Sequence, residues 1–145
     1  MIKVQIKKIN PDVELPSYET TGSSGVDLRA YIKSPITIKP QTSKIITTGI
    51  FLTIPKGCEV QIRPRSGLAS KSNISVLNSP GTIDSDYRGE IKIILFNHGR
   101  LDFIVKNGER VAQMVLVPIL KFDFEEVDEI SSTDRGAGGF GSTGK

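Results

Sequence analysis

The feature that most constrains this fold is a period-two pattern of apolar residues, interrupted by proline and glycine. Apolar and polar residues alternate, as they do in half-buried strands, over residues 2–7, 36–38, 60–62 and 103–105. Denser apolar runs predict strands buried on both faces at residues 45–54, 91–96 and 111–120. Turn residues separate these runs, and the best helix candidate is a short turn at residues 67–72. The pattern predicts an all-β fold: a sandwich, jelly roll or barrel.

Size, charge and cysteine content narrow the class of protein. A chain of 145 residues suits a single domain with its own core, and its net charge of +3 is too small for the basic field of a dedicated nucleic-acid binder. Cys58 has no disulfide partner in the chain, which predicts a buried thiol and a reducing compartment. Residues 1–10 lack the apolar run of a signal peptide. We expect a cytoplasmic protein with neither membrane nor direct nucleic-acid partners.

The last part of the chain differs in composition from the rest. Residues 131–145 contain five glycines and no aliphatic residue larger than alanine, so they cannot pack a core. We therefore divide the chain into a β domain, residues 1–130, and a flexible glycine-rich tail, residues 131–145. The tail is expected to become ordered when a ligand contacts Arg135 and Phe140.

Three local patterns resemble functional motifs without the context that those motifs need. The glycines at 136, 138 and 141 match a dinucleotide-binding fingerprint, but a βα unit before them and a helix after them are missing. Residues 139–145 match most of a phosphate-binding loop, but again no helix follows. His98 stands alone in a predicted turn, so a surface histidine is favoured over a catalytic or metal-binding one.

The acidic segment at residues 81–93 leads into an apolar strand. Strand alternation, projected backwards, would point Ile83 and Asp84 to opposite faces. A carboxylate at the end of a strand either caps turn amides or accepts a proton from a bound water. The residues alone favour the capping role for Asp84, Asp86 and Glu90. Tyr87 and Arg88 beside them suit cross-strand packing and a surface ion pair.

Basic loops point to a phosphorylated ligand. Residues 63–67, Arg-Pro-Arg-Ser-Gly, combine two guanidinium groups with a hydroxyl in a turn, and the planar guanidinium fits phosphate oxygens. Arg135 repeats the theme in the tail, and Phe140 could stack on a flat ring. Together with the acids, these loops suggest a nucleoside polyphosphate with a divalent cation, while a solvated basic turn remains the simpler alternative.

Five segments, in order, resemble the motifs of the homotrimeric dUTP pyrophosphatase (dUTPase) family. They cover most of the chain and read SGVDLRA (residues 24–30), RSGLA (65–69), Asn78 with GTIDSDYRGE (81–90), GERVAQM (108–114) and RGAGGFGSTG (135–144). A match to one short motif often arises by chance, but five matches in the same order and at the same spacings are specific. The resemblance implies a jelly-roll-like β fold and hydrolysis of dUTP to dUMP and pyrophosphate. That reaction limits uracil incorporation into DNA and supplies dUMP for dTMP synthesis.

The resemblance also implies residue roles. Asp84 would be the general base that activates water for attack on the α-phosphorus, which leaves Asp86 and Glu90 structural. Tyr87 would stack under the deoxyribose. Uracil would be read in a hairpin pocket by Asn78 and by backbone groups around Thr82, Ile83 and Lys92.

Further implied roles concern the phosphates, the metal and assembly. Asp27 would hydrogen-bond the water shell of Mg²⁺. Arg135 would reach the γ-phosphate and Phe140 would cover the uracil, both from a tail that closes the site of a neighbouring subunit in a homotrimer. The groups expected to hold the phosphates are Arg65, Ser66, Gly67 and Gln113.

Two alternatives stay open. A dCTP deaminase, or a bifunctional deaminase and dUTPase, shares the fold but would carry different residues around RSGLASK and IDSDYRGE. A non-catalytic nucleotide-binding module on the same scaffold is the other. Departures from the family pattern are small. Ser24 stands where alanine is common, and Arg63 stands where smaller or apolar residues are common. The charge of Arg63 could alter the electrostatic field near the phosphates.

Overall fold

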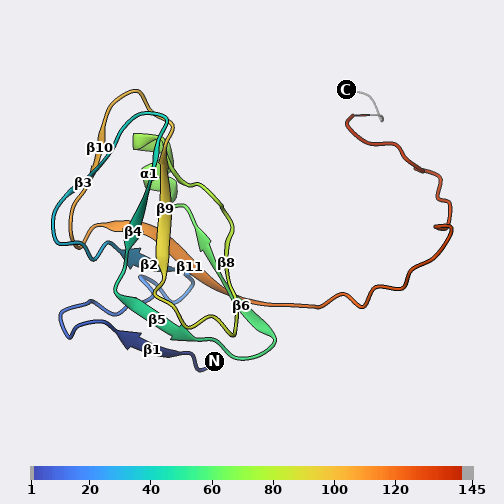
Figure 1. Ribbon diagram of the computed structural model, residues 1–145, viewed down its shortest axis with the longest axis horizontal. Coiled ribbons are helices and arrows are strands. Elements are labelled where there is room, and N and C mark those ends of the chain that lie inside the picture. The colour runs from blue at the N-terminus through green and yellow to red at the C-terminus, as the bar shows by residue number, and fades with distance from the viewer. Residues whose placement is uncertain (1, 142–145) are drawn as a thin grey trace.

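The computed structural model describes residues 2–141, which form eleven strands and one short helix (Figure 1). The elements in chain order are β1 (Gln5–Lys8), β2 (Val26–Arg29), β3 (Ile36–Ile38), β4 (Ser43–Thr47), β5 (Ile50–Thr53), β6 (Cys58–Arg63), α1 (Ser66–Ser72), β7 (Ile74–Val76), β8 (Gly81–Ile83), β9 (Lys92–Asn97), β10 (Phe103–Val105) and β11 (Arg110–Pro118). The all-β prediction is confirmed, and α1 is the helix expected at 67–72.

The strands form open antiparallel sheets rather than a closed barrel. The largest sheet has the order β2-β11-β6-β8, a second has the order β4-β9-β7, and β1-β5 and β10-β3 form two-stranded ribbons. Residues from the two larger sheets meet in one hydrophobic core, as in a sandwich. The fold is therefore jelly-roll-like, and the barrel alternative is wrong.

The apolar run at residues 45–54 is not one strand, because the chain changes sheets at Gly49. β4 pairs with β9, whereas β5 pairs with β1. Gly49 has φ of +67°, and a Cβ there would lie 2.8 Å from Val13 and 3.0 Å from Ile9. Only glycine fits both the backbone conformation and the space.

The dense apolar runs bury one face, not both. In β9, Ile93 and Leu95 are fully buried, while Ile94 between them is only half-buried. Its partner Ile45 on β4 is 59% exposed. The prediction of strands covered on both sides is therefore wrong for the single chain. Cys58 is buried, as expected.

After β11 the chain leaves the body and runs away from it (Figure 1). We call residues 120–130 the arm; it carries exposed Leu120, Phe122 and Phe124. The tail follows, and its residues 142–145 lie outside the described part. In the described residues no helix is long and apolar enough to cross a membrane.

Candidate active site

The outer face of β6 presents a row of polar side chains. Alternation buries Cys58, Val60 and Ile62 and leaves the residues between them half-exposed, namely Glu59, Gln61 and Arg63. Glu59 Oε1 accepts a hydrogen bond from Gln61 Nε2 at 2.7 Å. Gln61 Oε1 in turn accepts from Nη2 and Nε of Arg63 at 2.7 and 3.2 Å.

Strand register aligns three polar residues across the large sheet. Gln113 on β11 is the Cα partner of Asp27 on β2 and of Arg63 on β6. Gln113 Nε2 donates to the carbonyl oxygen of Pro64 at 3.0 Å. A Cβ on Gly25 would lie 2.5 Å from Gln113 Oε1, so a larger residue there would displace the end of this side chain. The sheet thus brings together residues of the first and fourth motifs and the two residues that precede the second.

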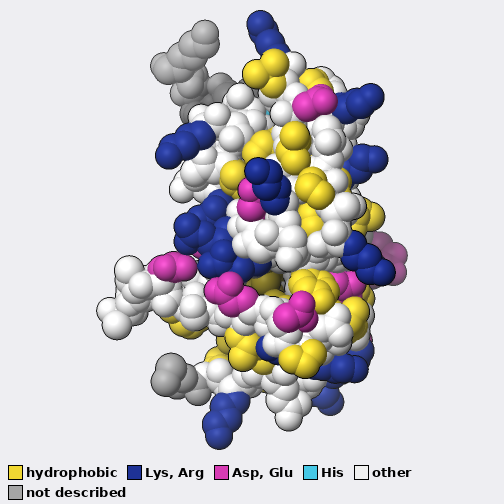
Figure 2. All heavy atoms as spheres, turned by 90° about the vertical axis from the view of Figure 1, so that its left-hand side faces the viewer, with side chains coloured by type: hydrophobic (Ala, Val, Ile, Leu, Met, Phe, Trp, Pro, Cys, Tyr) yellow, Lys and Arg dark blue, Asp and Glu magenta, His cyan; other side chains and the backbone are white. Residues whose placement is uncertain are grey.

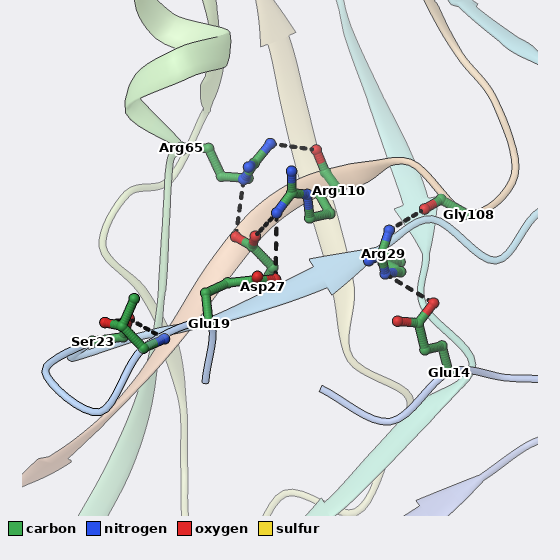
Figure 3. A network of polar contacts seen from close by, with 9 residues as sticks. Glu14, Glu19, Ser23, Asp27, Arg29, Arg65, Gly108 and Arg110 are labelled. Atoms are coloured by element: carbon green, nitrogen blue, oxygen red, sulfur yellow. Dashed lines mark hydrogen bonds and ion pairs between the residues drawn. The ribbon is translucent and has the colours of Figure 1, made fainter. Parts of the chain in front are cut away.

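Two arginines converge on Asp27 (Figure 3). Asp27 Oδ1 lies 2.9 Å from Arg65 Nε, and Oδ2 lies 3.1 Å from Arg110 Nη1. Arg65 Nη1 also donates to the carbonyl oxygen of Arg110 at 3.2 Å. The Asp27 side chain is 18% exposed, so water screens these pairs less than surface pairs. A more exposed carboxylate, Glu19, reaches Arg110 at 3.4 Å.

The role of Arg110 was missed from the sequence. It lies in the fourth motif, but its neighbours gave no indication that it faces Asp27, 83 residues earlier. The ladder between β11 and β2 shifts register between Arg110 and Ala112. That irregularity places the arginine beside the first motif and is invisible in a strand pattern.

The second motif forms a loop that opens into a cavity. Arg65 precedes α1 with extended dihedral angles, and its carbonyl oxygen accepts a hydrogen bond from Ala69 N at 3.0 Å. Ser66 and Gly67 in the first turn are exposed. Ser66 lines an open cavity of about 580 Å³, together with Gln113, Arg63, Pro64 and Pro80, among others. Basic and acidic side chains also gather at mid-height on one face of the molecule (Figure 2).

The third motif begins on an edge strand. Thr82 of β8 is the Cα partner of Gln61, so β8 continues the polar face of β6. The amide of Asn78 covers Gly81, where a Cβ would lie 3.1 Å from Nδ2. Asp84 is outside the strand: its carbonyl oxygen accepts from Tyr87 N at 3.1 Å in a turn, and its side chain is exposed. Because β8 ends at Ile83, the alternation projected to Asp84 does not apply.

The rest of this motif folds over itself. Tyr87 packs against Gly89, and its hydroxyl donates to the carbonyl oxygen of Glu90 at 3.0 Å. Glu90 Oε1 accepts from Gly49 N at 2.8 Å, so this acid does cap a backbone amide. Lys92 is the first residue of β9, and its Nζ lies 3.9 Å from Glu90 Oε2. Asp86 is exposed and makes no side-chain hydrogen bond with the described residues.

A ladder between β8 and β9 is absent from the described residues, because the two strands belong to different sheets. The hairpin expected around Thr82, Ile83 and Lys92 is therefore a crossing between sheets. Asp84 and Arg65 also diverge, since Asp84 lies beyond the Ile83 end of the β6–β8 pair and Arg65 beyond the other end. Val60, the partner of Ile83, and Arg63, the last residue of β6, are three residues apart, which separates their Cα atoms by about 10 Å.

The tail residues lie apart from the other motif residues. Arg135 Nε donates to the carbonyl oxygen of Gly138 at 2.8 Å, and Phe140 is fully exposed. The part of the fifth motif at 142–144 lies outside the described residues. His98 is exposed, as expected, and its Nε2 lies 2.7 Å from Ser75 Oγ.

Known proteins resemble this chain over nearly its whole length. A family profile described as dUTPase matches residues 11–144. Deoxyuridine 5'-triphosphate nucleotidohydrolases from Nautilia profundicola and Treponema denticola are each 53% identical, over 99% and 94% of this chain and 100% and 95% of their own lengths. A variant of the Staphylococcus bacteriophage 80alpha dUTPase, solved with dUpNHpp, matches with a TM-score of 0.85 at 25% identity over 100% of both chains.

Proposed function

This chain belongs to the dUTPase family, and we propose that it hydrolyses dUTP to dUMP and pyrophosphate. The observation that carries the proposal is the family match from residue 11 to 144, which includes every motif residue assigned below. The reaction would limit uracil incorporation into DNA by removing dUTP, and its product dUMP would supply dTMP synthesis. No observation favours a dCTP deaminase or a non-catalytic binding module.

Asp84 is the proposed general base. Its exposed carboxylate, in a turn that tethers its backbone to Tyr87, is open to a water molecule. The water oxygen would attack the α-phosphorus and transfer a proton to Asp84, while pyrophosphate leaves. General-base assistance contributes about 10²- to 10⁴-fold in rate, so positioning and charge neutralisation supply the remainder.

The base and sugar contacts fall to the third motif. Asn78 and the backbone around Thr82, Ile83 and Lys92 would read the uracil edge, and Tyr87 would stack under the deoxyribose. The bond from the Tyr87 hydroxyl to Glu90 fixes the ring in place, which supports a steric role. A close-fitting pocket rejects the thymine methyl group and the 2'-hydroxyl more strongly than a few hydrogen bonds could.

The phosphates would be held by Arg65, Ser66, Gly67 and Gln113. Arg65 is oriented by Asp27, and Gln113 by Pro64. Ser66 lines the same cavity as Gln113, and Gly67 beside it is exposed. Donors fixed before the substrate arrives stabilise developing negative charge without reorganising.

Mg²⁺ fits this site as an ion that arrives with the substrate. Among the described residues no group of three acids, histidines or cysteines could form a metal cage, and both oxygens of Asp27 already contact arginines. Mg²⁺ keeps several waters and binds readily through substrate phosphates, where it withdraws charge from the triphosphate. Asp27 would then contact the ion only through its water shell.

We infer that the working enzyme is a homotrimer with shared sites. Asp84 and Arg65 lie beyond opposite ends of one strand pair, which favours a site built from different chains. The tail of a neighbour would close it, with Phe140 over the uracil and Arg135 on the γ-phosphate. A single cysteine and the small net charge are consistent with a cytoplasmic protein without nucleic-acid partners.

A panel of dUTP, dTTP, dCTP and UTP, each with and without Mg²⁺, tests this function. Of the four nucleotides, we expect only dUTP to release pyrophosphate. The rate of this release should depend on Mg²⁺. Robust ammonia release from dCTP would instead indicate the deaminase. Binding of dUTP without turnover would indicate the non-catalytic module.

A further inference from the structure

We propose that Arg63 is an additional phosphate-binding residue, an inference that rests on the function proposed above. Arg63 is the Cα partner of Gln113 and lines the same cavity as Gln113 and Ser66. None of the roles above uses it.

The contacts of Arg63 orient its guanidinium without neutralising it. Nε and Nη2 share the amide oxygen of Gln61, and Nη1 has no acceptor among the described residues. The nearest acid of this row, Glu59, is bound to Gln61 instead, so Arg63 forms no ion pair with a described residue. A planar, charged donor held on one edge is suited to a phosphate oxygen on the other.

The neighbouring charges increase the need for such a group. Asp27 contacts both Arg65 and Arg110, and its single negative charge offsets much of the field of those two arginines. Arg63 lies two strands from Asp27 across the sheet and keeps its full charge. Since a triphosphate with one Mg²⁺ remains anionic, an unpaired arginine at the cavity attracts it.

This role predicts a ligand-dependent effect. Losing Arg63 should weaken ligands that carry phosphates and leave the nucleoside unaffected, because base and sugar contacts come from the third motif. Replacing Gln61 by methionine removes the oxygen that orients Arg63. That change should weaken phosphate binding in the wild type but add nothing once Arg63 is gone.

Calorimetric binding of dUpNHpp with Mg²⁺, and of deoxyuridine, to the full-length protein tests the proposal. We expect Arg63→Gln to weaken dUpNHpp binding about tenfold, with Arg63→Lys in between and deoxyuridine unchanged. Lys56→Gln, which removes one exposed charge at the opposite end of β6, is the matched control and should bind like the wild type.

Other results would overturn the inference. Unchanged dUpNHpp binding by Arg63→Gln would show that the guanidinium does not contact phosphate. Equal weakening of dUpNHpp and deoxyuridine, or an altered mass in sedimentation, would assign Arg63 to folding or assembly. If the wild-type protein bound no dUpNHpp, the proposed function itself would fail, which is a separate result.

Discussion

Asp27 and Arg65 form a partly buried ion pair at 2.9 Å, although 38 residues separate them in the sequence. Arg110 contacts the other oxygen of the same carboxylate. Asp27 therefore holds two like charges together, and the orientation of Arg65 depends on it.

The first prediction concerns this carboxylate. Asp27→Asn should raise the KM for dUTP about tenfold, because Arg65 and Arg110 would repel each other and Arg65 would lose its orientation. Steady-state kinetics at saturating Mg²⁺ measures the effect. Glu19→Gln is the control, since its contact with Arg110 is longer and more exposed. An unchanged KM in Asp27→Asn would remove the positioning role.

Asp84→Asn tests the general base. The substitution keeps the size of the side chain, so binding of dUpNHpp should persist while kcat falls about 10²- to 10⁴-fold. Asp86→Asn should keep near-normal turnover, because Asp86 is an exposed acid in the same turn. Near-normal turnover by Asp84→Asn would exclude Asp84 from the mechanism.

Subunit complementation tests whether sites are shared. Asp84→Asn and Arg65→Ala chains should each be nearly inactive alone. When they are refolded together, some sites would combine an intact Asp84 from one chain with an intact Arg65 from another, so activity should reappear. No recovery in a mixture that sedimentation shows to be trimeric would place both residues in one chain's site.

Truncation after Ile130 tests the tail. The described body ends its last strand at Pro118, so the truncated chain should fold and assemble as before. Turnover of dUTP should fall severely, because Arg135 and Phe140 are lost with the lid. Unchanged kinetics would make the tail a passive extension.

Glu90 tests a structural role for the third motif. Glu90→Ala leaves the Gly49 amide without its acceptor and should lower the free energy of unfolding by about 1–3 kcal/mol. Asp86→Ala, which breaks no side-chain hydrogen bond with described residues, should leave it unchanged. Denaturant unfolding of both variants compares them, and equal stability would show that the capping bond is dispensable.

The local pattern of apolar and polar residues predicted much of the fold but little of the site geometry. The alternation around Val60 and Ile62 predicts β6 because burial of one strand face depends on neighbours in sequence. β2, β7 and β8 were missed, although the similarly short β3 and β10 were predicted. The three missed strands are defined by pairing with the distant strands β11, β9 and β6, which a local pattern does not contain. The break at Gly49 depends on contacts with Val13 and Ile9, which no local window contains.

The site shows the same limit. Motif resemblance selected Asp27 and Arg65 separately, but their ion pair and the contact with Arg110 arise from strand pairing between distant segments. The capping role suggested for Glu90 is supported by its bond to Gly49. The amide it caps lies 41 residues away, however, rather than in the local turn that the pattern suggested.

The arm has a consequence for newly made chains. Leu120, Phe122 and Phe124 alternate with charged residues in a segment that forms no strand, so their apolar side chains stay exposed to water until another surface covers them. Acidic residues that alternate with exposed apolar residues act as gatekeepers, because like charges oppose the association of newly made copies. The arm therefore contains both the apolar residues that promote aggregation and the acidic residues that oppose it.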